Sequence, residues 1–475
     1  MATESAAPPV TAASPPGTSA TYAPGRGLNR YITWYSLATL GITLLWGGVL
    51  GIVLPLHVQH LEFAHYFTGA DAKVDLQALT DLKAQVAAGT AEATADQERL
   101  IGLLGQYEAA KVSGLSLVQS VGIITTMLVQ PLVGMLSDRT RSRWGRRAPY
   151  IAAGAVAGAA VLLTLSSAPT VGWVILLWSL VQLLGNVVQG PLTATVADRI
   201  PQDRLGTVSA ATGLVSYLAA VLGSLAAGTL FAQLGLGAYF PFVVTLAVLP
   251  LLFLLLVPDR SSKDLPVTRF TWAEVFKSYG YALRYPDFRW AWIAKVVLYI
   301  GYALATTFSL YMLQSYVRPA LSEAEAARTA PLLQMAGLPF TLISMVVAGR
   351  WSDKTGRRKP FVIGASLVMA ASFLIPFASP TLPAMFVQAM VMGLGFGAFL
   401  VVDQALFVDI LPDKQSAGRD LGMSALGQNL GQALGPVLAS FVVSLSGGTY
   451  TLVWPAAVAF VLFAAFVVIP IKKVR

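Results

Sequence analysis

The feature that most constrains the fold is a short basic loop between two apolar stretches, which occurs twice in the chain. In the first copy, residues 127–151, Asp138 is the one acid among five arginines, and apolar sequence lies on either side. The second copy, residues 349–360, places Asp353 215 positions after Asp138, and the glycine four positions before each aspartate keeps the same spacing. A tight cationic hairpin between two membrane spans has this pattern. Its recurrence predicts a duplicated membrane protein.

The rest of the chain is apolar enough to supply spans on both sides of each hairpin. Of its 475 residues, 56% are hydrophobic and 12% are charged, whereas about 25% are charged in ordinary soluble proteins. A helix that crosses a bilayer needs about 20 residues. We therefore predict an all-α membrane protein whose twelve transmembrane helices form two six-helix halves, at residues 31–59, 112–136, 149–168, 170–198, 207–231, 238–257, 288–315, 330–349, 360–379, 382–409, 421–446 and 449–470.

Polar segments divide this predicted architecture into five parts. They are a disordered tail (1–30), an N-terminal half (31–257), a linker (258–287), a C-terminal half (288–471) and a short tail (472–475). Composition supports the first assignment, because the tail is rich in Ala, Pro, Ser and Thr and lacks an apolar core.

Lysine and arginine indicate the orientation of the spans. Of 32 such residues, 25 fall in the tails, the hairpins and the linker, and six fall in the loops of the opposite side. The positive-inside rule then places both termini, the linker and the hairpins in the cytoplasm, for a multi-pass protein of the cell (plasma) membrane. The first outer loop, 61–110, is long, and its composition predicts short amphipathic helices; an external cap without function is the plainer interpretation.

Several function classes are disfavoured by composition. The chain has no cysteine and three histidines, which leaves little material for a metal site, and we expect no cofactor. The net charge of +9 lies in short loops between apolar stretches, so we interpret it as membrane topology and expect no nucleic-acid partner. No nucleophile, metal or phosphate-loop motif indicates an enzyme. We expect a monomer in the lipid bilayer.

The two hairpins resemble a known family. Their Gly-x-x-x-Asp-Arg/Lys…Gly-Arg-Arg pattern resembles the cytoplasmic loop of the major facilitator superfamily, over residues 31–471. The longer pattern in the first half, LVQP at 128–131 through SDR at 137–139 and GRR at 145–147, is similar to the glycoside-pentoside-hexuronide cation symporters and the sucrose/proton symporters. The sequence NVVQGP at 186–191, followed by Asp198, resembles the fourth helix of those symporters.

A second repeated loop suggests where gating acts. Asp198 and Pro201 in the first half correspond to Asp409 and Pro412 in the second, 211 positions later. Each loop begins a helix whose positive N-terminus can face the acid of the other half's hairpin. We therefore predict that Asp138 approaches Arg419, and Asp353 approaches Arg204, when the inner side is closed. The predicted gating residues are Asp138, Arg139, Arg146, Arg147, Arg204, Asp353, Arg357 and Arg419.

One acid falls inside a predicted span. Asp403 lies six residues before Asp409, a depth of about 9 Å at 1.5 Å per residue, and Lys295 lies at a similar depth in the seventh span. Ionisable groups at membrane depth are costly unless they serve a path or a partner. In the major facilitator fold that the chain resembles, the helices that carry these residues line the cavity. We therefore predict that Asp403 and Lys295 meet and couple protons. A structural ion pair is the alternative.

A sugar has many hydroxyl groups and apolar ring faces, so its site needs neutral hydrogen-bonding groups and aromatic rings. Trp46 is favoured because Gly47 and Gly48 leave room beside it for a sugar ring. The predicted solute-binding residues are Trp46, Gln119, Asn186, Gln189, Tyr302, Gln404, Gln428 and Asn429.

The chain departs from the sucrose-symporter pattern at two positions. Gln182 stands where that family places an acid, and Thr193 where it places an arginine. Either Asp403 has taken over coupling, or transport is uncoupled or carries another substrate.

These observations predict a secondary active transporter that works by alternating access, with proton-coupled uptake of a sugar (a glycoside or disaccharide) as first choice. An exporter of amphipathic small molecules or drugs is the alternative within transport, and a transport-inactive sensor or scaffold is the alternative outside it. Hairpins retained in both halves argue against the last.

Overall fold

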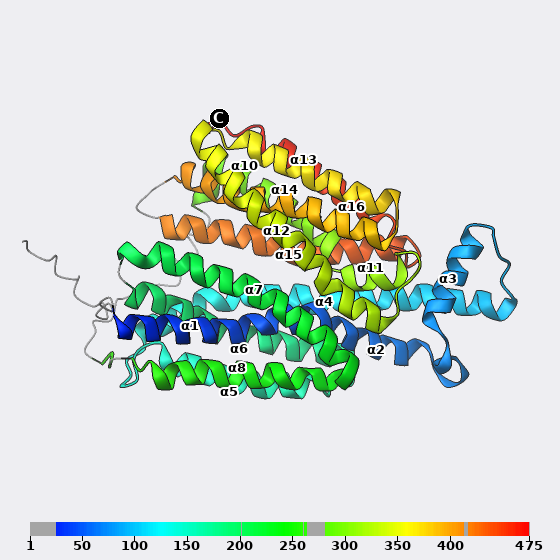
Figure 1. Cartoon of the computed structure of the whole chain (residues 1–475), viewed down its shortest axis with the longest axis horizontal. Coiled ribbons are helices and arrows are strands. Elements are labelled where there is room, and N and C mark those ends of the chain that lie inside the picture. The colour runs from blue at the N-terminus through cyan, green and yellow to red at the C-terminus, as the bar shows by residue number, and fades with distance from the viewer. Residues whose placement is uncertain (1–24, 201, 260, 264–280, 413–416, 475) are drawn as a thin grey trace, which may run out of the picture.

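The computed structural model describes residues 25–200, 202–259, 261–263, 281–412 and 417–474, and it is a helical bundle of two halves (Figure 1). The N-terminal half, blue to green, lies below the C-terminal half, yellow-green to red. Its helices are α1 (Arg26–Leu45), η1 (Trp46–Val53), α2 (Leu54–Tyr66), α4 (Ala95–Arg139), α5 (Ala148–Leu165), α6 (Val171–Arg199), α7 (Gln202–Leu234), η3 (Gly235–Ala238) and α8 (Tyr239–Leu256).

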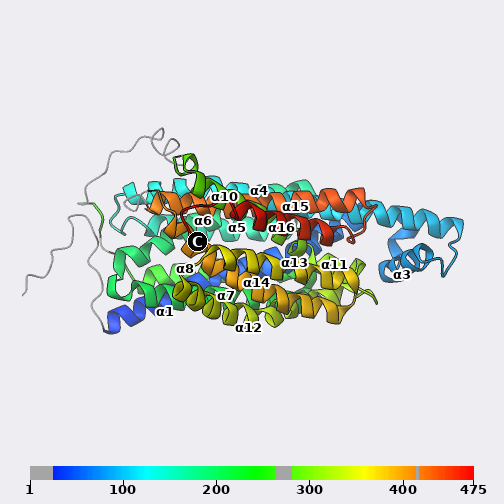
Figure 2. The ribbon, with the colours of Figure 1, turned by 90° about the horizontal axis from the view of Figure 1, so that it is seen from above.

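The C-terminal half has the same number of spanning helices. It consists of η4 (Ala282–Arg284), α10 (Pro286–Thr306), α11 (Ser309–Ser315), α12 (Glu323–Thr355), α13 (Lys359–Ala378), α14 (Leu382–Asp409), α15 (Ala417–Leu445) and α16 (Val453–Val468). Two short helices, η2 (Gly69–Lys73) and α3 (Leu76–Ala87), form a cap that projects beyond one end of the bundle in both views (Figures 1 and 2). We call this the cap end, and the end with the two basic loops the hairpin end.

The predicted fold class is confirmed. Among the described residues, nine helical segments are long and apolar enough to cross a membrane, and one of them, Thr212–Leu256, contains α8 and most of α7. Counting these two separately and adding α15 and the shorter α16 gives the predicted twelve. Large apolar side chains face outward along the bundle, for example Leu128, Leu255 and Phe466, as expected where lipid replaces water around a protein.

Local sequence signals explain where many of these helices begin. The Thr170 side chain accepts from the Trp173 amide at the start of α6. Proline occupies the first turn of α5, α10, α13 and α14, where its missing N–H is not needed. Gly356 ends α12 with a φ of 62°, a left-handed conformation that glycine adopts without strain.

Small residues allow some helices to approach closely. A Cβ on Gly47 of η1 would lie 1.9 Å from the carbonyl oxygen of Ala220 in α7. Between the halves, a Cβ on Gly228 of α7 would lie 2.2 Å from the carbonyl oxygen of Ala327 in α12. Larger side chains at these glycines would force the helices apart.

The helices next to the cap differ from the predicted loop 61–110. The first span continues to Tyr66, and α4 already begins at Ala95, so helix occupies both ends of that range. The early start of α4 has a local cause, because Thr94 and Gln97 form a capping box in which each side chain bonds the other's backbone amide. Residues 1–24 of the predicted tail and 264–280 of the predicted linker lie outside the described residues.

Candidate transport site between the two halves

A cavity of about 600 Å³ lies between the two halves. Trp46, Gln119 and Tyr217 line it from the N-terminal half, and Tyr302 and Gln388 line it from the C-terminal half. Every lining side chain among the described residues is neutral. A polar but uncharged cavity that both halves share can hold a solute with hydrogen-bonding groups and no net charge.

Trp46 stands at the first turn of the π-helix η1, a rare conformation that is common at functional sites. Its Nε1 donates to Oε1 of Gln189 at 3.3 Å, and its ring meets Trp178 edge to face with centroids 5.9 Å apart. Of the two glycines expected to leave room beside Trp46, Gly47 lines the central cavity. A Cβ on Gly47 would meet the backbone of Ala220 and one on Gly48 the ring of Phe242, so both glycines also allow close helix packing.

A second aromatic wall comes from the C-terminal half. Tyr302 of α10 stacks on Phe396 of α14, with ring centroids 4.3 Å apart and planes inclined by 11°. Both rings border the cavity opposite Trp46. Ring faces beside amides are the combination that a sugar ring with hydroxyl groups requires.

Three of the eight predicted solute-binding residues, Trp46, Gln119 and Tyr302, line the central cavity. Gln189 borders an adjacent cavity of about 260 Å³ within the N-terminal half, whose polar lining is mainly threonine and serine hydroxyls. Asn186 is occupied elsewhere, because its amide donates to Thr126 Oγ1 at 3.0 Å and to the Gln182 carbonyl at 2.7 Å.

The remaining three predicted solute-binding residues lie outside the cavity lining. Gln404 is exposed, and Gln428 and Asn429 are half-buried on α15. The physical reason for Gln428 and Asn429 is their depth along α15: they lie about one helical turn before Gln432, on the same face but nearer the hairpin end, and Gln432 borders the cavity. These placements correct the sequence-based choice.

Other lining residues were missed by the sequence reasoning. Tyr217 on α7, Gln334 on α12 and Gln388 on α14 all border the central cavity. The two glutamines carried a usable signal, because each is an amide inside an apolar stretch. Tyr217 carried none, since a tyrosine in an apolar helix is common.

The structure brings Lys295 and Asp403 together, as predicted. Nζ of Lys295 lies 2.8 Å from Oδ2 of Asp403, and their side chains are 5% and 7% exposed. The ammonium also donates to Oγ of Ser424 at 2.9 Å and lies 4.8 Å from the Phe407 ring centroid. The space beside this pair, bordered by α13 and α16, has no room for a water molecule. In this conformation the pair is sealed inside the C-terminal half.

A second buried ion pair, which the sequence did not indicate, lies near the cap end. Glu108 and Lys111 lie in α4 with Oε1 and Nζ 2.8 Å apart, and their side chains are at most 5% exposed. The sequence placed Glu108 in the outer loop because the early start of α4 was not foreseen. Ser315 and Tyr450 of the C-terminal half donate to the same carboxylate at 2.8 and 3.0 Å.

The first basic hairpin forms a network within the N-terminal half. Oδ1 of Asp138 lies 2.6 Å from Nη2 of Arg147 and 3.8 Å from Nη1 of Arg146. Both arginines also bind Asp198 at the end of α6, and Arg147 donates to Oγ of Ser137 at 2.5 Å. The predicted gating residue Arg139 is the last residue of α4.

The second hairpin repeats this network in the C-terminal half. Nη1 of Arg358 lies 2.6 Å from Oδ1 of Asp353 and donates to Oγ of Ser352 at 2.8 Å, while Nε donates to Asp409 at 3.0 Å. The arginine that binds Asp353 is therefore Arg358, whereas the predicted Arg357 has an exposed side chain.

The two contacts predicted between each hairpin and the opposite half were predicted for the state that is closed on the inner side. In this structure Asp138 and Asp353 bind arginines of their own half, and Arg204 is exposed in the first turn of α7. The side chain of Arg419 lies outside the described residues.

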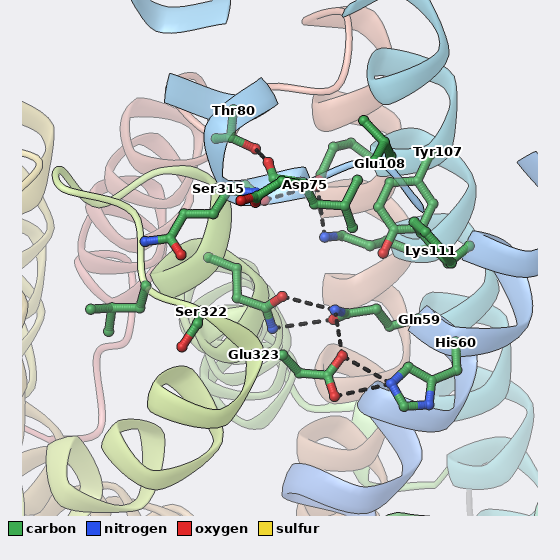
Figure 3. A pocket seen from close by; sticks show the side chains of 16 residues that line it. Gln59, His60, Asp75, Thr80, Tyr107, Glu108, Lys111, Ser315, Ser322 and Glu323 are labelled. Atoms are coloured by element: carbon green, nitrogen blue, oxygen red, sulfur yellow. Dashed lines mark hydrogen bonds and ion pairs between the residues drawn. The ribbon is translucent and has the colours of Figure 1, made fainter. Parts of the chain in front are cut away.

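The halves are joined at the cap end. Nε2 of Gln59 donates to Oε1 of Gln314 at 2.8 Å, and Nε2 of His60 lies 2.9 Å from Oε2 of Glu323 (Figure 3). The Tyr311 hydroxyl donates to the carbonyl of Pro55 at 2.7 Å. These contacts link α2 to α11 and α12 and hold the cap end closed.

Comparison with known proteins identifies relatives along most of the chain. A family model described as MFS/sugar transport protein matches residues 109–472. The chain is 33% identical to sucrose transport protein SUC4 of Arabidopsis thaliana over 122 residues, which are 22% of this chain and 24% of that protein. It is 27% identical to multidrug resistance protein MdtG of Citrobacter koseri over 353 residues, 73% of this chain and 82% of that protein.

The alignment with the sucrose transporter thus spans about a quarter of that protein's length. Solved structures share the fold. The nucleoside transporter NupG superposes with a TM-score of 0.61 at 14% identity, covering 89% of this chain and all of the other. A bacterial homolog of the lysosomal transporter Spinster superposes with a TM-score of 0.63 at 12% identity, covering 94% and 96%.

Proposed function

The chain belongs to the MFS/sugar transport protein family, and from that premise we propose that it carries a small neutral sugar across the membrane by alternating access of the central cavity. The observation that carries this proposal is the cavity lining, which joins amides to stacked aromatic rings and holds no charged side chain among the described residues. A charged solute without a counter-charge would lose much hydration energy there. A hydroxyl-rich neutral solute exchanges its hydrogen bonds with water for bonds to the amides.

The cavity size is compatible with a sugar. Ligand pockets in proteins range from roughly 300 to 1,000 Å³, and this cavity has about 600 Å³. The similarity to sucrose transport proteins supports the same class of solute.

An exporter of amphipathic compounds remains the second candidate. The similarity to a multidrug resistance protein along most of the chain favours it. So do the apolar members of the cavity lining, which include Leu50, Leu333 and Met392. The two candidates differ in the solutes that should compete for the cavity.

We assign the cap end to the outside and the hairpin end to the cytoplasm of the plasma membrane, on the distribution of Lys and Arg. With this orientation the contacts of Gln59 and His60 close the outer side. Asp138 and Asp353 would change partners to the opposite half when the inner side closes. Such contacts can hold only one state of the cycle.

Asp403 and Lys295 are the proposed proton-coupling pair. Proton exchange with water requires access, and in this conformation the pair is sealed and the Lys295 ammonium holds the carboxylate. Coupling therefore requires that the packing of α10 against α14 loosens during the cycle, so that a proton can replace the ammonium as partner of Asp403. A solute-linked movement of Tyr302, which lies on the same helix as Lys295, would supply that link.

Uptake by proteoliposomes tests the proposal. Labelled sucrose, maltose and lactose are offered with and without an inward proton gradient, and tetraphenylphosphonium serves as an amphipathic competitor. One pH unit stores about 1.4 kcal/mol per proton, enough for tenfold accumulation with one coupled proton. We expect concentrative uptake of a sugar in the wild type, and exchange without accumulation in Asp403→Asn.

Matched variants locate the solute. Gln388→Ala removes an amide from the central cavity, whereas Gln404→Ala removes an exposed amide from the same helix. We expect the first to raise the half-saturating sugar concentration about fivefold and the second to leave it unchanged. Equal effects of the two, or competition by the lipophilic cation without transport of any sugar, would reject the sugar proposal.

A further inference from the structure

A second cavity, of about 380 Å³, lies at the cap end, apart from the central one (Figure 3). Gln59 and Tyr107 line it from the N-terminal half, Gln314 and Glu323 line it from the C-terminal half, and Thr80 of α3 lines it from the cap. The space is therefore bounded by three separate parts of the chain.

Two hydrogen bonds join the cap to the C-terminal half above this cavity. Nε2 of Gln77 donates to the carbonyl of Ala320 at 2.6 Å, and Nζ of Lys83 donates to the carbonyl of Gly447 at 3.3 Å. Both acceptors belong to loops of the C-terminal half. Separation of the halves at the cap end must break these bonds, so the roof of the cavity opens when that end opens.

Tyr107 lines this cavity with a hydroxyl that has no partner among the described residues. Its side chain is 1% exposed, and among the described residues no group forms a hydrogen bond with its hydroxyl. The ring is held in place by edge contacts with Phe63 and Phe67, whose centroids lie 6.2 and 5.6 Å away. A buried hydroxyl without a partner costs about 1 to 3 kcal/mol. Because Tyr107 stands in the cavity wall, a molecule bound in the cavity can supply the missing bond (Figure 3).

The charges around the cavity restrict the chemistry of that molecule. Lys111 pairs with Glu108 at 2.8 Å and His60 with Glu323 at 2.9 Å, and the lining holds one carboxylate more, that of Asp75. An anion would be repelled by this surplus of acceptors. Hydroxyl groups can donate to carboxylates and amide oxygens and accept from Tyr107, so a neutral polyhydroxylated molecule fits the lining.

We propose that this cavity is a second solute site, in which a neutral sugar binds beneath the cap on its way between the outer solution and the central cavity. The inference rests on the proposed function, because it takes the same class of solute for both sites. The sugar bonds the Tyr107 hydroxyl there, and the cap closes over it by the bonds of Gln77 and Lys83.

Cysteine protection in the full-length, otherwise cysteine-free chain tests each site separately. Val74→Cys reports on the outer cavity and Leu50→Cys on the central one, since each residue is half-buried in the lining of its own cavity. The rate of labelling by a small methanethiosulfonate reagent is measured in nanodiscs with sucrose, maltose or lactose. Glucuronate and tetraethylammonium serve as the anionic and cationic comparisons.

Two substitutions show which cavity holds the sugar that protects each cysteine. Tyr107→Phe removes a hydroxyl that bonds no protein group, so the fold should persist, and Leu50→Cys labelling checks that it does. We expect a neutral sugar to protect Val74→Cys, with a half-protecting concentration that Tyr107→Phe raises about fivefold, the effect of one lost hydrogen bond. Gln119→Ala, in the central cavity, should weaken protection of Leu50→Cys and leave that of Val74→Cys unchanged.

The results that would contradict the outer site can be told apart from those that would contradict the proposed function. No protection of Val74→Cys by any of the sugars overturns the outer site, and protection by the ions alone overturns its solute class. The outer site is also overturned if Tyr107→Phe leaves the half-protecting concentration at Val74→Cys unchanged, or if Gln119→Ala raises it. Either result would show that a conformational change, and not a sugar bound beneath the cap, protects Val74→Cys. Leu50→Cys reports separately on the central cavity. Absence of sugar protection at that position would therefore count against the proposed function and not against the outer site.

Discussion

Replacement of Asp403 by asparagine should destabilise the C-terminal half through charge alone. Asparagine nearly matches aspartate in shape, so the substitution creates no cavity. It leaves the Lys295 ammonium, 5% exposed, without the carboxylate that lay 2.8 Å away. The ammonium keeps its bond to Ser424 and its contact with the Phe407 ring.

The size of the effect follows from burial. Loss of one partner from a buried ion pair costs about 3 to 5 kcal/mol, and the contacts that Lys295 retains favour the lower end, about 3 kcal/mol. Removal of both charges in Asp403→Asn/Lys295→Met should restore stability to within about 1 kcal/mol of the wild type, because no buried charge is then uncompensated. Asp353→Asn is the matched control. Its side chain is 71% exposed although Arg358 binds it at 2.6 Å, so the expected cost is at most about 1 kcal/mol.

Equilibrium unfolding by sodium dodecyl sulfate in dodecyl maltoside micelles measures these differences, with the four proteins compared under identical conditions. A single variant as stable as the wild type would show that the pair is not sealed from water. A double variant as unstable as the single one would show that Asp403 acts by packing rather than by charge. Either result refutes the reasoning.

Three further predictions concern orientation, gating and the cap. Cysteines placed at the exposed positions Ala88 and Ser261 should be labelled from opposite sides of the membrane by an impermeant reagent, and equal labelling of both would reject the assigned orientation. Asp138→Asn should shift the population toward the state open at the hairpin end, seen as faster labelling of cysteines in the central cavity; unchanged rates would count against its gating role. The hydrogen bond from Arg99 holds the pKa of Asp71 below its usual value of 3.8. The contribution of Asp71 to cap stability is therefore present above that value and lost as the pH falls through the lowered pKa, so hydrogen exchange in η2 should stay slow from pH 8 to pH 5 and rise in Arg99→Gln at all these pH values.

The fold could be predicted because its signals are local and repeated. A span needs only a run of apolar residues. The two hairpins indicate the duplication, because Asp138 and Asp353 each lie four positions after a glycine. The meeting of Lys295 and Asp403 was also predictable, because few ionisable residues lie at membrane depth and each needs a partner.

The solute site was predictable only in part, because it depends on the depth of each residue along its helix and on helix ends. Gln428 and Gln432 lie one turn apart on the same face of one apolar helix, and sequence alone does not show which of them is level with the cavity. The burial of Glu108 depends on where α4 begins, which a capping box before Ala95 decides. Its partners Ser315 and Tyr450 come from distant parts of the chain.

Alternating access is the central claim, and a reversible lock at the cap end tests it most directly. Gln59 and Gln314 face each other across the halves with their side chains hydrogen-bonded at 2.8 Å. In the double variant Gln59→Cys/Gln314→Cys, a short bifunctional methanethiosulfonate should join the halves, while each single cysteine variant controls for labelling alone. We expect sugar exchange in proteoliposomes to fall to background on cross-linking and to return when a reductant cleaves the link. Exchange that continues at the uncross-linked rate in fully cross-linked protein would contradict the account.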